Sequence, residues 1–203
     1  AGRDASLQST VTTSGGDVQL TVTRDLQQDG SVNTGGGAAQ WQAGGAIRQP
    51  GSLQTAGGAV SWQADGQISH SGSSDTAGGN SQWRAGSDIV DSGTVSTAGG
   101  SNRWQAGGDI RHSGSQSATT GAVSWVASGA IVNDGSVQTT SGNVQWQAGS
   151  SLQHNGSVQT AGAVADWQAG TDLTLNGNLT TNGGLAKLRA GGDLQQQAGS
   201  LQT

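Results

Sequence analysis

The spacing of tryptophan is the feature that most constrains how this chain can fold. The sequence has 203 residues and seven Trp, and each Trp lies 21 residues from the next. They are Trp41, Trp62, Trp83, Trp104, Trp125, Trp146 and Trp167. Leu20 and Leu188 hold the same place one period outside this run. A fixed period of this size is the signature of a repeat architecture, in which each repeat is one structural unit.

The other positions of the repeat divide it into three short segments. With Trp as position 1, Ala fills position 3, Leu or Ile position 7, Gly position 11, mostly Val or Leu position 13, mostly Thr position 15, and Gly position 18 except at Ala163. Residues 60–64, 108–111 and 136–139 exemplify the segments, in which apolar and polar residues alternate as in a strand. Glycine interrupts every segment before a helix of useful length can form. We expect these glycines to supply the positive φ of sharp corners.

Three strands and three corners per repeat predict an all-β fold, a right-handed parallel β-helix (β-solenoid). Its coils are 21 residues long with three short strands each, and residues 1–203 form a single repeat region of roughly 9–10 coils. A strand spacing of about 4.8 Å gives a rod about 46 Å long. The hand follows from the right-handedness of parallel crossovers. The last coil fits only if one extra residue precedes its third strand, within residues 199–203.

Composition narrows the function classes once the repeat is recognised. Leu, Ile and Val total 31 residues, about 15% of the chain, which by itself is typical of a disordered segment. A solenoid resolves the conflict because each coil needs few large side chains. The absence of Cys excludes disulfides and thiolate chemistry, and 8 basic against 13 acidic residues argue against a nucleic-acid partner. No apolar run is long enough for a membrane-spanning helix.

Several phrases resemble the repeats of filamentous haemagglutinins. They are Trp-Gln-Ala-Gly-Gly-Asp-Ile at 104–110, Ala-Gly-Gly-Asp-Leu at 190–194 and Gly-Ser-Val-Gln-Thr-Ala-Gly at 156–162. The resemblance implies the shaft of a virulence-associated exoprotein, exported by two-partner secretion to the Gram-negative cell surface. That family includes adhesins and contact-dependent growth-inhibition proteins. It also implies an outer-membrane secretion transporter as partner, and contact with host or neighbouring cells through domains outside this sequence. The 21-residue length and the Trp of each central repeat depart from the family's shorter repeat.

The Trp ladder has two interpretations. Alternation places Val60, Trp62 and Ala64 on one face of their strand, and the favoured reading buries that face so that the indoles stack along the axis. The alternative turns the rings outward as a platform for sugar rings. The same parity argument turns Thr55 and its equivalents inward with Leu53.

Position 9 carries a polar stripe with all three His of the chain. Its members are His70, Asp91, His112, Asn133 and His154, and Gln49 precedes them. Metal binding and a pH switch are the chemistries that such residues suggest. A linear ladder does not give the convergence of ligands that zinc needs, so the preferred reading is a polar stripe near a corner in which two imidazoles flank Asp91.

Position 6 carries a second set of candidates. It holds Asp4, Asp25, Asp88, Asp109, Asp172 and Asp193. Paired carboxylates suggest the acid/base or calcium chemistry of β-helical polysaccharide enzymes. However, Asp after a Gly-rich corner is a common turn residue. The period is also unbroken between Leu20 and Leu188, which leaves no loop to wall a catalytic groove. We therefore expect no enzymatic activity, no cofactor and no metal site.

The sequence thus predicts a non-catalytic structural shaft of a large secreted bacterial surface adhesin or exoprotein. The shaft would project a distal binding or toxin-delivery domain, and we expect the native polypeptide to continue beyond both ends of this sequence. The alternative is a polysaccharide-binding β-helix module that uses an outward Trp ladder.

Overall fold

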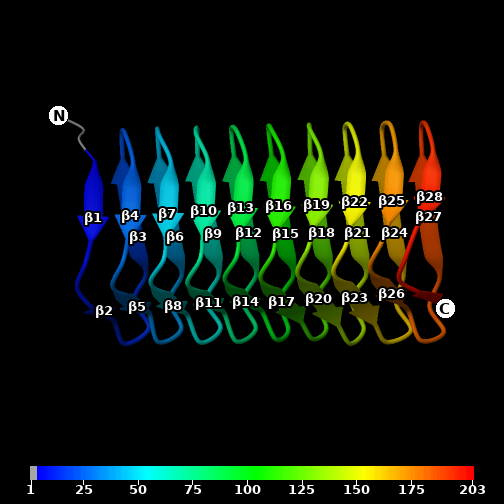
Figure 1. Ribbon diagram of the computed structural model, residues 1–203. Helices are drawn as coiled ribbons and strands as arrows, with labels where there is room; N and C mark the ends of the chain where they lie inside the picture. The colour runs from blue at the N-terminus through cyan, green and yellow to red at the C-terminus, as the bar shows by residue number, and fades with distance from the viewer. Residues whose placement is uncertain (1–3) are drawn as a thin grey trace.

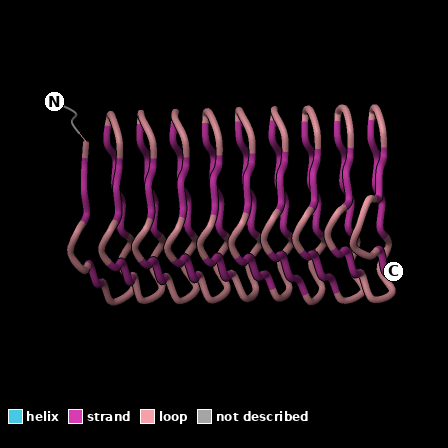
Figure 2. Tube along the Cα trace, in the orientation of Figure 1, coloured by secondary structure: helices cyan, strands magenta, loops and turns pink. Residues whose placement is uncertain are grey.

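The chain forms a rod of stacked coils built entirely from short parallel strands. The computed structural model describes residues 4–203, and within that range Figure 2 shows strands and loops with no helix. Each coil contributes one strand to each of three sheets, which run the length of the rod (Figure 1). The predicted β-solenoid is confirmed, with about nine stacked coils.

The three sheets are named here A, B and C. Sheet A contains β1 (Ala5–Leu7), β4 (Leu26–Gln28), β7 (Ile47–Gln49), β10 (Ile68–His70), β13 (Ile89–Asp91), β16 (Ile110–His112), β19 (Ile131–Asn133), β22 (Leu152–His154), β25 (Leu173–Leu175) and β28 (Leu194–Gln196). Sheet B contains β2 (Val11–Thr12), β5 (Ser31–Asn33), β8 (Ser52–Gln54), β11 (Ser73–Asp75), β14 (Thr94–Ser96), β17 (Ser115–Ala118), β20 (Ser136–Thr139), β23 (Ser157–Thr160), β26 (Asn178–Thr180) and β29 (Leu201–Gln202). Sheet C contains β3 (Val18–Val22), β6 (Ala39–Ala43), β9 (Val60–Ala64), β12 (Ser81–Ala85), β15 (Asn102–Ala106), β18 (Val123–Ala127), β21 (Val144–Ala148), β24 (Ala165–Ala169) and β27 (Ala186–Ala190).

The register between coils follows the 21-residue period of the sequence. Trp83 of β12 lies opposite Trp62 and Trp104 of the neighbouring coils, and Ala85 opposite Ala64 and Ala106. The predicted slip in the last coil is also confirmed, because β29 pairs Leu201 with Leu179, a separation of 22 residues. Identical residues therefore stack into ladders along the rod.

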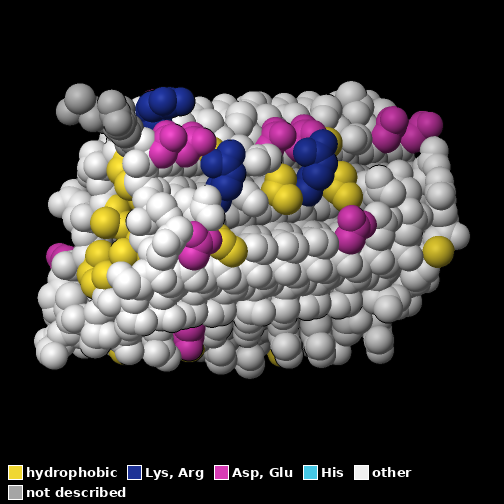
Figure 3. All heavy atoms as spheres, turned by 60° about the vertical axis from the view of Figure 1, so that its left-hand side comes forward, with side chains coloured by type: hydrophobic (Ala, Val, Ile, Leu, Met, Phe, Trp, Pro, Cys, Tyr) yellow, Lys and Arg dark blue, Asp and Glu magenta, His cyan; other side chains and the backbone are white. Residues whose placement is uncertain are grey.

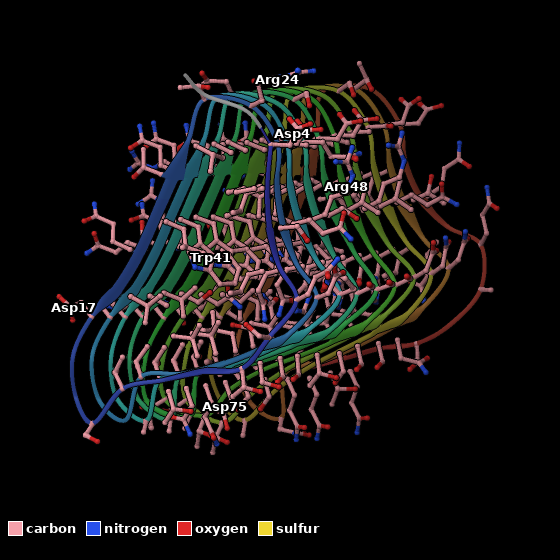
Figure 4. The ribbon with its side chains drawn as sticks, turned by 90° about the vertical axis from the view of Figure 1, so that its left-hand side faces the viewer. Asp4, Asp17, Arg24, Trp41, Arg48 and Asp75 are labelled. Carbon is pink, nitrogen blue, oxygen red and sulfur yellow. The ribbon has the colours of Figure 1, made fainter. Side chains whose placement is uncertain are left out.

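The hand of the solenoid is visible from its N-terminal end. In Figure 4 the chain rises from Asp17 at the left to Arg24 at the top, descends past Arg48 at the right, and passes Asp75 at the bottom as it recedes from the viewer. A clockwise course that recedes is right-handed, as predicted from the preference of parallel crossovers.

Alternation along the strands fills the interior with one apolar face from each sheet. The sheet C strands show the burial pattern of a half-buried strand, with Val60, Trp62 and Ala64 inside and Ser61 and Gln63 outside. Ile68 of sheet A and Leu53 of sheet B complete the same core. Thr55 is fully buried, as its parity predicted, and its hydroxyl donates a 2.5 Å hydrogen bond to the carbonyl oxygen of Gly58 across the corner.

The glycines at position 11 have a different role from the one predicted. The positive φ values of the repeated corners fall instead at positions 16 and 17, for example at Ala56 (50°) and Gly57 (111°). A Cβ atom on Gly72 would lie 1.8 Å from the carbonyl oxygen of Gly51 in the preceding coil. Glycine recurs at position 11 because stacked corners approach each other too closely for any side chain, and not because the turn requires a left-handed backbone.

Candidate functional site

The Trp ladder lies inside the rod. All seven indoles are at most 1% exposed, so the inward interpretation is confirmed and the outward aromatic platform is wrong. Neighbouring rings stack with centroids 4.3–4.9 Å apart and interplanar angles of 1–12°. The strand spacing of about 4.8 Å sets this separation, which suits near-parallel aromatic stacking. The ladder is therefore a structural spine with no face open to a ligand.

The side chains of the polar stripe also point into the interior, from sheet A, whereas the Trp side chains come from sheet C. Its five members His70, Asp91, His112, Asn133 and His154 are at most 1% exposed. Each follows a buried Leu or Ile by two residues on a sheet A strand, so alternation turns both inward. The imidazole of His112 packs edge-on against Trp104 and Trp125 at 5.7 and 5.2 Å. The stripe is thus part of the core, more deeply buried than the corner position predicted from the sequence.

Two imidazoles flank Asp91, as the sequence predicted. The Nδ1 atom of His70 bonds one carboxylate oxygen, and the Nδ1 atom of His112 lies 2.7 Å from the other. The backbone N–H of Gly93 donates a third hydrogen bond at 3.1 Å. Burial by itself raises the pKa of the Asp91 carboxyl, but the hydrogen bonds from His112 and His70 outweigh it and hold the pKa below its ordinary value of 3.8. Asp91 is therefore ionised at neutral pH.

The partners of His112 both accept hydrogen bonds. Its Nδ1 atom faces the ionised Asp91, and its Nε2 atom lies 3.2 Å from the carbonyl oxygen of Ser136. Carboxylate and carbonyl oxygens only accept, so the ring is held between two acceptors. The Nε2 atom of His70, in contrast, has no partner among residues 4–203.

His154 occupies the same repeat position two coils after His112, but its ring lies between one hydrogen-bond donor and one acceptor. Its Nδ1 atom lies 3.0 Å from the Nδ2 atom of Asn133, from which it accepts, and its Nε2–H donates to the carbonyl oxygen of Asn178 at 3.0 Å. One nitrogen accepts and one donates, which defines a neutral imidazole. Burial lowers the pKa of His154 below its ordinary value of 6.5 and so favours the same form. Asn133 supplies the donor that an uncharged histidine needs.

The position-6 carboxylates close corners between coils. The Oδ1 atoms of Asp25, Asp88 and Asp109 each accept a 2.8 Å hydrogen bond from the backbone N–H of the residue one coil further on. The N–H of Ala46 and the guanidinium of Arg48 hold the pKa of the Asp25 carboxyl below its ordinary value. These contacts fit the turn role expected from the sequence, since each carboxylate completes the backbone hydrogen bonding of a corner.

The geometry of these groups limits the chemistry they can perform. The polar stripe is enclosed by three sheets, and its side chains bond one another and backbone carbonyl oxygens in a line along the rod. Among residues 4–203, no three His or Asp side chains are placed to hold a metal ion together. No helix in that part of the chain has the length and apolar character to cross a membrane.

The fold and the ladders together define a parallel β-solenoid repeat protein whose core contains a Trp ladder and a buried polar stripe. Neither the protein-family models, nor the curated proteins, nor the solved structures contain a match to this chain.

Sequence reasoning missed two groups of residues. Ser81 and Asn102 are buried on sheet C at positions that hold Val or Ala in other coils, a departure from the repeat visible in the sequence. The second group is cationic and lies on the outer face of sheet C, where Arg84 and Arg103 interrupt the surrounding glutamines. The sequence could have revealed them, because each is a charged residue at a repeat position that is neutral in most other coils.

Proposed function

We propose that this chain is the non-catalytic shaft of a secreted bacterial surface protein of the filamentous-haemagglutinin type. The observation that carries the proposal is the constancy of the coil. From β3 to β27 the sheet C register repeats every 21 residues without insertion, and the Trp ladder is continuous from Trp41 to Trp167. A rod of constant cross-section suits the task of holding another domain at a distance.

The physical basis of the shaft role is stiffness. Every interior coil is hydrogen-bonded to both neighbours through three parallel sheets, as in the bond from the N–H of Ile68 to the carbonyl oxygen of Asp88 at 3.0 Å. Bending the rod requires these ladders to open on one side and the stacked indoles to separate. In a repeat stack each coil contacts mainly its nearest neighbours, so folding can propagate coil by coil as the chain emerges from a membrane. The absence of Cys removes any oxidation step from that process.

The proposal assigns the chain an outer-membrane transporter of the two-partner type and a location on the cell surface. A distal adhesive or toxin-delivery domain would make the contact with a host or neighbouring cell. The resemblance of residues 104–110, 156–162 and 190–194 to the haemagglutinin repeat supports this assignment. The polysaccharide-binding alternative that relied on outward Trp rings is not retained, because those rings are buried.

The test is surface labelling of intact cells. Antibodies raised against this chain should label intact producing cells, and added protease should remove the label while a cytoplasmic marker survives. Deleting the cognate two-partner transporter should abolish labelling while the protein is still detected in lysates. Labelling that appears only after lysis would contradict the surface assignment, and labelling that survives loss of the transporter would contradict the export route.

A further inference from the structure

The charged side chains of this acidic protein are segregated by face. The chain has a net charge of −5, and seven of its eight Lys and Arg lie within residues 4–203. Four of those seven are on the outer face of sheet C, namely Arg84, Arg103, Lys187 and Arg189. Two carboxylates lie on the same side: Asp166 on β24, and Asp65, which directly follows β9 and lines a surface hollow with Arg84. Figure 3 shows mixed acidic and basic groups in a band along the rod on the side that carries sheet A. The outer face of sheet C is therefore positive, at four minus two charges.

The cations on the outer face of sheet C also differ in their pairing. Arg24, Arg48 and Arg111 lie within 4 Å of Asp side chains beside sheet A. Arg189 pairs with Asp166 on sheet C. The remaining three described cations have no ion pair with any residue of the 4–203 segment, and all three are exposed on the outer face of sheet C: Arg84, Arg103 and Lys187. Although the protein has 13 Asp, the described cations without an ion pair all lie on one face, where they can contact another molecule.

The outer face of sheet C carries separate shallow hollows. Each sheet C strand turns two side chains outward, and half of these are Gln, as at Gln145 and Gln147. Figure 4 shows side chains tipped with nitrogen and oxygen along the left-hand side of the coils. Where the short side chains of Ser124 and Val126 replace long ones, the surface sinks into a hollow of about 180 Å³ that extends to Arg189. A hollow of about 350 Å³ is lined by Arg84 and Asp65, and one of about 140 Å³ lies over β3, β6 and β9.

We propose that the outer face of sheet C binds an acidic linear polysaccharide, a polymer of uronic-acid type, laid along the axis of the rod. Guanidinium groups recognise carboxylates through charge-assisted hydrogen bonds, and Gln amides both donate to and accept from sugar hydroxyls. No hydrogen bond joins Gln63, Gln105, Gln147 and Gln168 to other side chains among the residues described. The outward side chains of successive sheet C strands lie one strand spacing apart, so an extended polymer along the axis meets two rows of side chains in which Gln is the commonest residue.

Other anionic polymers fit this face less well. Single-stranded nucleic acid is held by aromatic rings on which bases stack, and here every Trp is buried while the sequence has no Phe or Tyr. An acidic peptide that binds by strand addition needs an open sheet edge, whereas this is the face of a sheet whose backbone groups are bonded to neighbouring coils. A flexible polyhydroxylated acid is the partner that these side chains suit.

The experiment compares oligogalacturonate of defined length with its methyl-esterified form, which has the same backbone without the charge. Binding to the intact chain is measured by calorimetry at low and physiological salt. Binding of the acid form that weakens with salt, and at least about tenfold weaker binding of the ester, are expected. Single-stranded DNA of similar length serves as a competitor. Tighter binding of DNA than of the oligogalacturonate, or equal binding of acid and ester, would overturn the proposal.

A matched pair of triple variants locates the site. R84Q/R103Q/K187Q removes three charges from sheet C and introduces Gln, which the chain already carries at equivalent places such as Gln63 and Gln82. R24Q/R48Q/R111Q removes three charges from the sheet A side. The first variant should lose at least about tenfold in affinity and the second should stay within about twofold. Equal losses would mean that binding follows net charge alone, and circular dichroism on both variants separates a binding defect from a folding defect.

Discussion

Replacing Asp91 by Asn tests the role of a buried, ionised carboxylate in the core. The side chain is fully buried and holds His112 through its Nδ1 atom at 2.7 Å and His70 through the other oxygen. An amide has one accepting oxygen, so it can satisfy only one of the two imidazoles. The other imidazole then faces an NH₂ group and loses its carboxylate acceptor.

The expected cost of the D91N substitution is large because it breaks a buried pair from one side. Removing one partner of a buried ion pair costs about 3–5 kcal/mol, since the remaining charge stays buried without compensation. Each unsatisfied buried polar group contributes about 1–3 kcal/mol on its own. We therefore expect D91N to be destabilised by about 3–5 kcal/mol at neutral pH, measured by denaturant unfolding with Trp fluorescence and far-UV circular dichroism. A loss below about 1 kcal/mol would refute the ionised assignment.

The chain itself provides the control for D91N. Leu175 occupies the same position of a later coil and is 1% exposed, so the interior accepts an aliphatic side chain there. The triple variant H70L/D91L/H112L removes all three polar groups together. Replacing a complete buried ionic group by apolar side chains is typically neutral or stabilising by about 1–4 kcal/mol. A triple variant as unstable as D91N would show that the damage comes from poor packing and not from an unpaired charge.

Three further predictions concern the glycine corner, the neutral histidine and the repeat unit. G72A places a methyl group against the carbonyl oxygen of Gly51, so we expect a loss of about 3 kcal/mol or more, whereas the exposed neighbour variant S71A should stay within about 0.5 kcal/mol in the same unfolding assay. A G72A loss as small as that of S71A would contradict the close approach of the corners. The pKa of His154 is lowered in the folded state, so the stability that this residue contributes is complete above its ordinary pKa of 6.5 and is lost as the pH falls below that value. Thermal melts of H154Q should therefore show a weaker pH dependence between pH 7.5 and 5 than those of the parent chain. Identical pH profiles would contradict the neutral assignment. Deleting residues 84–125, which are two whole coils, should leave a folded rod that is shorter by about 10 Å. Deleting residues 84–115, which are not a whole number of coils, should abolish the cooperative melt. Equal tolerance of both deletions would contradict the 21-residue coil.

Most of the fold could be predicted from the sequence because the period fixes both register and parity. Trp62 sets the register of every coil, and alternation from Trp62 and Leu53 correctly buried Val60 and Thr55. The extra residue before β29 was visible as a slip in the repeat. A repeat sequence reports its own packing because each residue lies beside its equivalents in the next coils.

The role of glycine and the state of the polar stripe could not be predicted in the same way. Gly72 is needed because two corners approach closely in space. In a sequence, glycine at a turn is first explained by a positive φ, and the close contact between corners becomes visible only in the structure. The different surroundings of His112 and His154 depend on whether Asp91 or Asn133 faces the ring, and on which carbonyl oxygen its Nε2 atom meets. That second contact comes from a neighbouring coil 24 residues away, a geometry that the linear pattern does not give.

Hydrogen exchange on the isolated chain tests whether residues 4–203 form a continuous, stiff stack of hydrogen-bonded coils. We expect protected amides in all three sheets, with the greatest protection in the central sheet C strands from β9 to β24, which have a coil on each side. Uniformly rapid exchange, or protection confined to one or two coils, would contradict the continuous rod.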